Sequence, residues 1–219
     1  MDQFSRSWTA LRAAVAQLRD EDFALPSGCV GWLVRDLVCH LIIDAQDVLI
    51  TLVTPVDAAP TRDAATYWNV LDTPTGDDPL DALIVRLAAA YEEPWLLKFH
   101  LDDVGSAAGR AAELADRAGR VGTRDEVLTA GDYLSAYVLE WTLHHLDLTA
   151  HLPHAAPPPE EGLRQSRELL ESIVGTALPP SFSDKEALLI ATGRRPPTNP
   201  QQAALANLPK ALSLPLTLG

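Results

Sequence analysis

The chain has 219 residues, of which 47% are hydrophobic and 21% are charged, and its net charge is −13. This composition excludes a disordered chain and is typical of a globular protein that can bury a sizeable core. Acidic residues outnumber basic ones, 30 against 17. The acidic excess argues against nucleic acid and anionic membrane surfaces as partners, because both attract basic patches.

The cellular location is predicted from what the sequence lacks. Residues 1–22 have neither the basic start nor the apolar run of a secretion signal, and no segment is apolar for long enough to span a bilayer. Two cysteines, Cys29 and Cys39, are too few for a disulfide framework. We therefore expect a cytoplasmic protein with both thiols reduced.

Apolar residues recur at helical spacing along most of the chain. Up to about residue 152 this pattern predicts four long helices, at residues 2–20, 33–53, 77 to about 118 with an interruption at Pro94, and 130–150. Two shorter elements are expected between them, a helix at residues 64–71 and an extended piece within 120–134. Thr129 is expected to cap the last long helix, with Asp132 in its first turn.

The pattern changes after residue 152. Residues 153–159 form a proline-rich linker, residues 160–174 a clear helix, and residues 184–208 a helix, loop and second helix. The predicted fold is therefore all-α, with a four-helix bundle over residues 1–152 and a helical C-terminal extension over residues 153–219.

Three polar residues of the predicted bundle suggest a metal site. Glu140 and His144 are spaced i, i+4 and share one helix face, and His40 lies on another helix. Two imidazoles and one carboxylate bind a divalent ion and leave positions free for water or substrate. Spacing alone, however, favours an ordinary solvated face for Glu140 and His144, and it also allows a core-edge role for His40.

Two segments carry a resemblance to a known family. GWLVRDLVCHL (31–41) and LTAGDYLSAYVLEWTLHHLDLTAHL (128–152) resemble the metal-bearing helices of the DinB-like superfamily, and more closely those of the N-terminal domain of mycothiol-dependent maleylpyruvate isomerases. The segment ATGRRP (191–196) resembles part of the C-terminal portion of those isomerases. The resemblance implies a DinB-like bundle in which His40, Glu140 and His144 bind a divalent ion, with zinc as the first candidate and nickel, iron or manganese as others.

The resemblance also implies a cosubstrate, and nearby polar residues suggest supporting roles. A mycothiol-type thiol is expected to act as the nucleophile on a small electrophile, either in thiol S-transfer or in thiol-dependent cis–trans isomerisation. Asp147, or alternatively Asp36, is expected to hydrogen-bond a ligand imidazole, and an ordinary surface position is the alternative for both. Arg194 or Arg195 is expected to pair with a carboxylate of the thiol or the substrate, with a solvated loop position as the alternative.

Other functions stay open at this point. The same ion could activate water or polarise a carbonyl in a hydrolase, lyase or cyclase that uses no thiol, or the bundle could bind a metal or ligand without catalysis. The helical extension also differs from the mixed α/β C-terminal part of the isomerases. We therefore do not assign maleylpyruvate as the substrate. The chain is expected to be a monomer or a homodimer.

Overall fold

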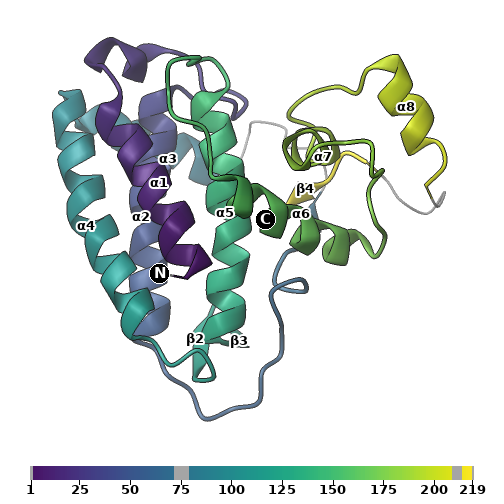
Figure 1. The fold of residues 1–219 in the computed structure, drawn as a ribbon. Coiled ribbons are helices and arrows are strands. Elements are labelled where there is room, and N and C mark those ends of the chain that lie inside the picture. Colours follow the sequence, from purple (N-terminus) through teal and green to yellow (C-terminus); the bar gives the residue numbers. More distant parts are fainter. Residues whose placement is uncertain (1, 72–78, 209–213, 219) are drawn as a thin grey trace.

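The computed structural model describes residues 2–71, 79–208 and 214–218. Its described N-terminal part is a bundle in which α2 packs closely on α4 and α5 packs on α1, with α3 on the outer side of α2 (Figure 1). The helices are α1 (Gln3–Gln17), α2 (Val34–Leu52), α3 (Pro79–Ala90), α4 (Pro94–Leu114) and α5 (Ala130–Thr149), with a 3₁₀ turn at Asp20–Ala24. The all-α prediction is confirmed. The expected break at Pro94 separates α3 from α4, and the expected start of α3 at residues 77–78 lies outside the described residues.

Aromatic side chains hold the bundle together. The rings of Trp8 in α1 and Trp141 in α5 are stacked with their centroids 3.8 Å apart. Trp8 Nε1 donates to the carbonyl oxygen of Gly105 in α4, at 2.8 Å. Glycine is needed there because a Cβ on Gly105 would lie 2.7 Å from the Trp8 ring. One indole therefore fixes the positions of three helices.

A short hairpin precedes α5, within the residues 120–134 where the sequence predicts an extended piece. Strands β2 (Arg120–Thr123) and β3 (Glu126–Thr129) pair antiparallel, with Thr123 opposite Glu126. The two residues between the strands, Arg124 and Asp125, both have positive φ, at 48° and 64°, as a two-residue type I′ turn requires. Thr129 then caps α5 by accepting the backbone N–H of Asp132, which confirms the predicted cap.

The prediction of a helix at residues 64–71 is wrong. Asp63 accepts the backbone N–H groups of Ala65 and Thr66 and so stabilises a single turn. The chain then becomes extended as β1 (Val70–Leu71), which pairs antiparallel with β4 (Thr217–Leu218) near the C-terminus. Pairing with a strand about 150 residues away leaves no sign in local periodicity.

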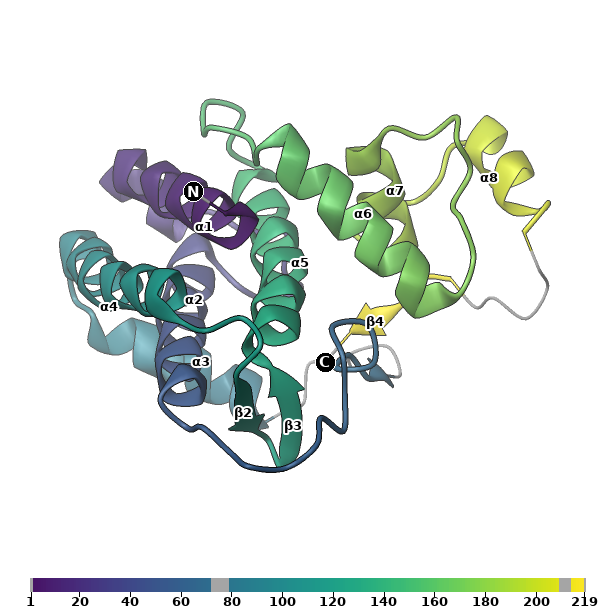
Figure 2. The same ribbon diagram turned by 60° about the horizontal axis from the view of Figure 1, so that its bottom comes forward.

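The extension packs on the side of α5 that faces away from α4 (Figures 1 and 2). It contains α6 (Glu160–Val174), α7 (Asp184–Ala191) and α8 (Asn199–Leu205). Leu139, Leu143 and Leu146 of α5 join the apolar cluster of the extension, whereas Leu134 and Trp141 belong to that of the bundle. Because α5 serves both cores, the domain boundary expected after residue 152 stays a prediction. None of the described helices is long and apolar enough to cross a membrane.

A buried histidine forms a hydrogen bond to the linker between α5 and α6. His145 is only 1% exposed, and its Nε2 lies 2.9 Å from the carbonyl oxygen of Ala156. Burial lowers the pKa of His145 to about 4, although the hydrogen bond to Ala156 acts in the opposite direction. The imidazole is therefore neutral near pH 7 and donates its N–H to the linker.

We expect this histidine to make stability depend on pH. Below the ordinary histidine pKa of 6.5, His145 binds a proton in the unfolded chain. In the folded chain His145 binds a proton only near pH 4. The free energy of unfolding should therefore fall by up to about 3 kcal/mol over this range. Urea unfolding of the wild type and of His145→Gln between about pH 7 and about pH 5 checks this. The variant should lose less stability on acidification, and equal losses in both proteins would contradict the assignment.

Candidate metal centre

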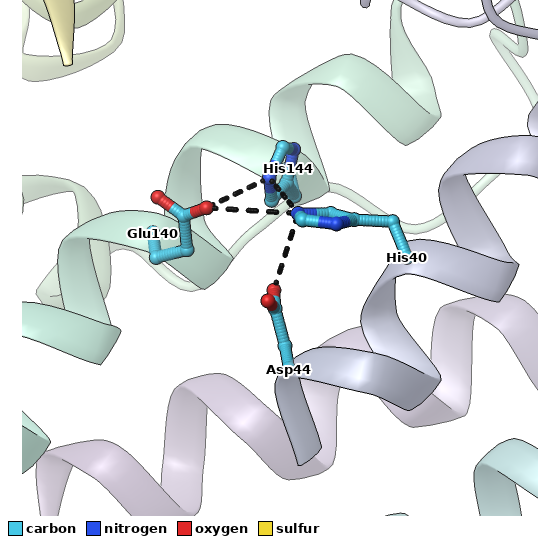
Figure 3. A group of neighbouring side chains, drawn as sticks. All are labelled: His40, Asp44, Glu140 and His144. Atoms are coloured by element: carbon cyan, nitrogen blue, oxygen red, sulfur yellow. Dashed lines mark hydrogen bonds and ion pairs between the residues drawn. The ribbon is translucent and has the colours of Figure 1, made fainter. Parts of the chain in front are cut away.

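The three residues that the sequence singles out meet between α2 and α5 (Figure 3). His40 Nε2 lies 3.1 Å from His144 Nε2 and 3.7 Å from Glu140 Oε1. His144 Nε2 lies 3.0 Å from the same oxygen. Glu140 and His144 are adjacent because i, i+4 residues stack on one helix face. His40 reaches them because α2 packs against α5, which accounts for the long separation in sequence.

A fourth side chain, Asp44, joins this group. Its Oδ2 lies 3.5 Å from His40 Nε2, and the side chain is 8% exposed. Asp44 is not among the ligands expected from the sequence. A signal was nevertheless present, because Asp44 follows His40 by four residues, with the same spacing as Glu140 and His144.

The four side chains fit a divalent metal ion. Each offers one ligand atom, and these atoms all lie within 4.8 Å of one another. Two imidazole nitrogens and two carboxylate oxygens suit zinc and several other divalent ions. Asp44 Oδ2 is buried and has no hydrogen-bond partner among the described residues. A buried carboxylate oxygen left unpaired is costly, and a bound cation would satisfy it.

The charges of the group favour a cation at the same place. Burial raises the pKa of Glu140, but the neighbouring His144 and His40 outweigh it and hold that pKa well below its usual range. Burial lowers the pKa of His144, but Glu140 and Asp147 raise it well above its ordinary value. Burial, with Glu140 adding to it and His40 opposing it, raises the pKa of Asp44 to about 6. Without an ion, a proton on His144 provides positive charge beside these carboxylates.

Asp147 contacts the Nδ1 side of the His144 ring. Its Oδ2 lies 3.2 Å from His144 Nδ1. The same carboxylate accepts two hydrogen bonds from Arg194, each at 2.8 Å. Burial raises the pKa of Asp147, but His144 and Arg194 more than compensate and lower it to about 2. An ionised Asp147 that accepts from Nδ1–H leaves His144 Nε2 directed at the other three side chains.

The two arginines of the extension lie in different places. Arg194 reaches the site, but its guanidinium is paired with Asp147. Arg195 does not line the cavity that lies beside the four side chains. Its guanidinium instead donates a hydrogen bond to Gln201 at 3.2 Å and lies 3.9 Å from Glu186. The structure therefore does not bring Arg195 to the site, because α7 and α8 hold its side chain. A carboxylate-binding role for Arg194 stays a prediction.

A cavity of about 510 Å³ opens beside the four side chains. The bundle and the extension both contribute to its wall. The residues that line it are Gly28, Cys29, Val30, Trp32, His40, Asp44, Tyr67, Trp68, Asp81, Arg124, Tyr137, Glu140, Leu143, His144, Thr192, Gly193, Arg194, Pro215, Leu216, Thr217 and Leu218. Its size is sufficient for a small organic ligand next to the candidate ion.

Cys29 is the cysteine among the described residues that line this cavity. Its Sγ lies 3.3 Å from Asp147 Oδ2 and 3.8 Å from His144 Nδ1. Burial raises the pKa of Cys29, although His144 opposes the change. The residue is therefore held as a thiol and is poorly suited to be a nucleophile. The other cysteine, Cys39, is buried in the core of the bundle.

The model of one family, the mycothiol maleylpyruvate isomerase N-terminal domain, matches residues 4–149. A search of curated proteins and a search of solved structures return no significant match. The matched segment covers α1 to α5 and therefore includes all four candidate metal-binding residues. By this match the chain belongs to the mycothiol maleylpyruvate isomerase N-terminal domain family.

Proposed function

We propose that the protein is a divalent-metal-dependent enzyme that uses a low-molecular-weight thiol of the mycothiol type as its nucleophile. The reaction is thiol S-transfer to a small electrophile, or thiol-dependent cis–trans isomerisation of one. The observation that carries this proposal is the convergence of His40, Asp44, Glu140 and His144 on one wall of the 510 Å³ cavity. The family of the bundle agrees with it.

His40, Glu140 and His144 would hold the ion, with Asp44 as a further donor. A divalent ion bound there supplies the charge that converts a thiol to a thiolate at neutral pH. The described residues that line the cavity offer no equivalent thiolate, because burial raises the pKa of the Cys29 thiol. An external thiol is therefore the better candidate for the attacking sulfur.

The remaining residues orient the ligands and limit access by water. Asp147 fixes the ring of His144 through Nδ1. The C-terminal residues Leu216 and Leu218 and the aromatic rings of Trp32 and Trp68 line the cavity. Such apolar walls reduce the dielectric constant around the reacting groups and strengthen their electrostatic interactions.

Removal of a candidate ligand should remove the metal without unfolding the chain. We expect His40→Ala and Glu140→Ala to lose stoichiometric metal, because each deletes one of the donors that meet at the site. His151→Ala is the matched control, since His151 is exposed and lies just beyond the C-terminal end of α5. Elemental analysis of the purified proteins measures metal content, and circular dichroism reports folding. Full metal content in folded His40→Ala and Glu140→Ala would refute the site.

Asp44 should have a smaller effect than the other three residues. Asp44→Asn keeps the size of the side chain but removes the negative charge beside His40. We expect the affinity for zinc to fall by about 10–100-fold, the range found when a partner of a metal ligand is lost. Competition titrations with a chelator measure this. An affinity equal to that of the wild type would show that Asp44 neither binds the ion nor assists its ligands.

The role of a thiol can be tested separately from metal binding. We expect metal-loaded protein to convert conjugated cis-enones or alkyl halides only when a small thiol such as mycothiol or N-acetylcysteine is present. Mass spectrometry distinguishes a stable thioether from an isomerised product, and the same mixtures without protein give the background rate. Equal turnover with and without thiol would instead support a water- or carbonyl-based reaction. A protein that binds metal yet is inactive under all these conditions would support a non-catalytic bundle.

A further inference from the structure

Two arginines, Arg124 and Arg194, are among the described residues that line the cavity. The guanidinium of Arg194 makes two hydrogen bonds of 2.8 Å to the buried carboxylate of Asp147. Because that pair neutralises both charges, Arg194 offers little to an anionic ligand unless the pair is broken. Arg124 differs, because no carboxylate of the described residues lies within ion-pair distance of its guanidinium.

The backbone of Arg124 suggests that its side chain has a role. Arg124 occupies the first position of the β2–β3 turn with φ at 48°. Glycine or asparagine adopts this conformation with less strain than arginine. The turn itself therefore does not require an arginine. Non-glycine residues with positive φ are uncommon and often occur at functional sites.

Tyr67 holds the guanidinium of Arg124 at the cavity. The centre of the guanidinium lies 6.0 Å from the centroid of the Tyr67 ring, which is within the range of a cation–π contact. This contact restricts the arginine without using the in-plane N–H groups that bind carboxylates. Tyr67 also lines the cavity. Arg124 is thus oriented but keeps its hydrogen-bonding capacity.

The charge of the surroundings limits what Arg124 can bind. The candidate metal site forms another part of the cavity wall and contains the carboxylates of Asp44 and Glu140. The whole chain has a net charge of −13. One guanidinium in this setting suits a singly charged, planar group better than a phosphate dianion. A carboxylate is such a group, and it matches the two parallel N–H bonds of arginine.

We propose that Arg124 is a specificity-determining residue that binds the carboxylate of a small-molecule ligand in this cavity. The inference rests on the proposed function in that it places the ligand beside the metal-binding residues. The carboxylate can belong to the electrophile or to the thiol, and the two sources are separated by experiment. The proposal also assigns to Arg124 the carboxylate contact that the sequence suggests for Arg194 or Arg195.

Isosteric acids and amides provide the test. For the electrophile, the probes are cinnamate and cinnamamide; for the thiol, they are N-acetylcysteine and its amide. Isothermal titration calorimetry gives the Kd of each with metal-loaded wild type, Arg124→Gln and Arg124→Lys. We expect the wild type to prefer the acid of one pair by about tenfold or more. Arg124→Gln should reduce the preference to about one, with Arg124→Lys between them.

Arg120→Gln is the matched control. Arg120 lies on β2 of the same hairpin, but it faces Asp57 and the carbonyl oxygen of Ala58 and does not line the cavity. It should keep the preference of the wild type. A wild type without preference in either pair, an unchanged preference in Arg124→Gln, or an equal loss in Arg120→Gln would overturn the proposal.

A second background separates this proposal from the proposed function. In His40→Ala, which should lack the metal, the effect of Arg124→Gln on acid binding should persist, because Arg124 is not a metal ligand. If instead the acid binds through the ion, the preference will already be absent in His40→Ala and the assignment to Arg124 fails. A wild type that holds no metal but still prefers the acid through Arg124 would refute the proposed function alone.

Discussion

The site depends on two carboxylates placed between α2 and α5, the buried Asp44 and the partly buried Glu140. A buried carboxylate is tolerated only when positive charge and hydrogen-bond donors compensate for lost hydration. Here His40 on one helix and His144 on the other lie within 4 Å of these carboxylates, and the pKa of His144 is raised well above its ordinary value. The packing of the two helices is thereby linked to the charge of the site. The same demand for positive charge explains why the group suits a divalent cation.

The extension is connected to this site through a chain of contacts. Arg194 pairs with Asp147, Asp147 contacts His144, and His144 contacts Glu140. Asp147 is also held from the other side, because its carbonyl oxygen accepts the N–H of Gly28 at 2.8 Å. The family model ends at residue 149, yet the cavity is completed by residues beyond 190. The ligand pocket is therefore a joint product of the family bundle and a C-terminal segment that the family match does not describe.

Local patterns were sufficient for much of the fold and for part of the site. Helical periodicity predicts the long helices, and the i, i+4 spacing of Glu140 and His144 predicts that they share a face. Contacts between distant segments were not predictable in this way. The pairing of β1 with β4 and the capture of Arg194 by Asp147 both require tertiary structure. Arg124 was missed because hairpin arginines are normally solvated; this one is also exposed, and only the folded chain shows that it lines the cavity.

The position of Asp44 links the identity of the ion to the chemistry. Zinc in proteins is most often four-coordinate. If His40, Asp44, Glu140 and His144 all bound a tetrahedral ion, no position would be left for a thiol. The proposed reaction would therefore require either that Asp44 stays outside the coordination sphere and accepts a hydrogen bond, or that the ion takes more than four ligands, as nickel, iron and manganese do. Because Asp44 Oδ2 has no hydrogen-bond partner among the described residues, the second arrangement satisfies the buried oxygen directly. The choice of metal therefore cannot be separated from the role of Asp44.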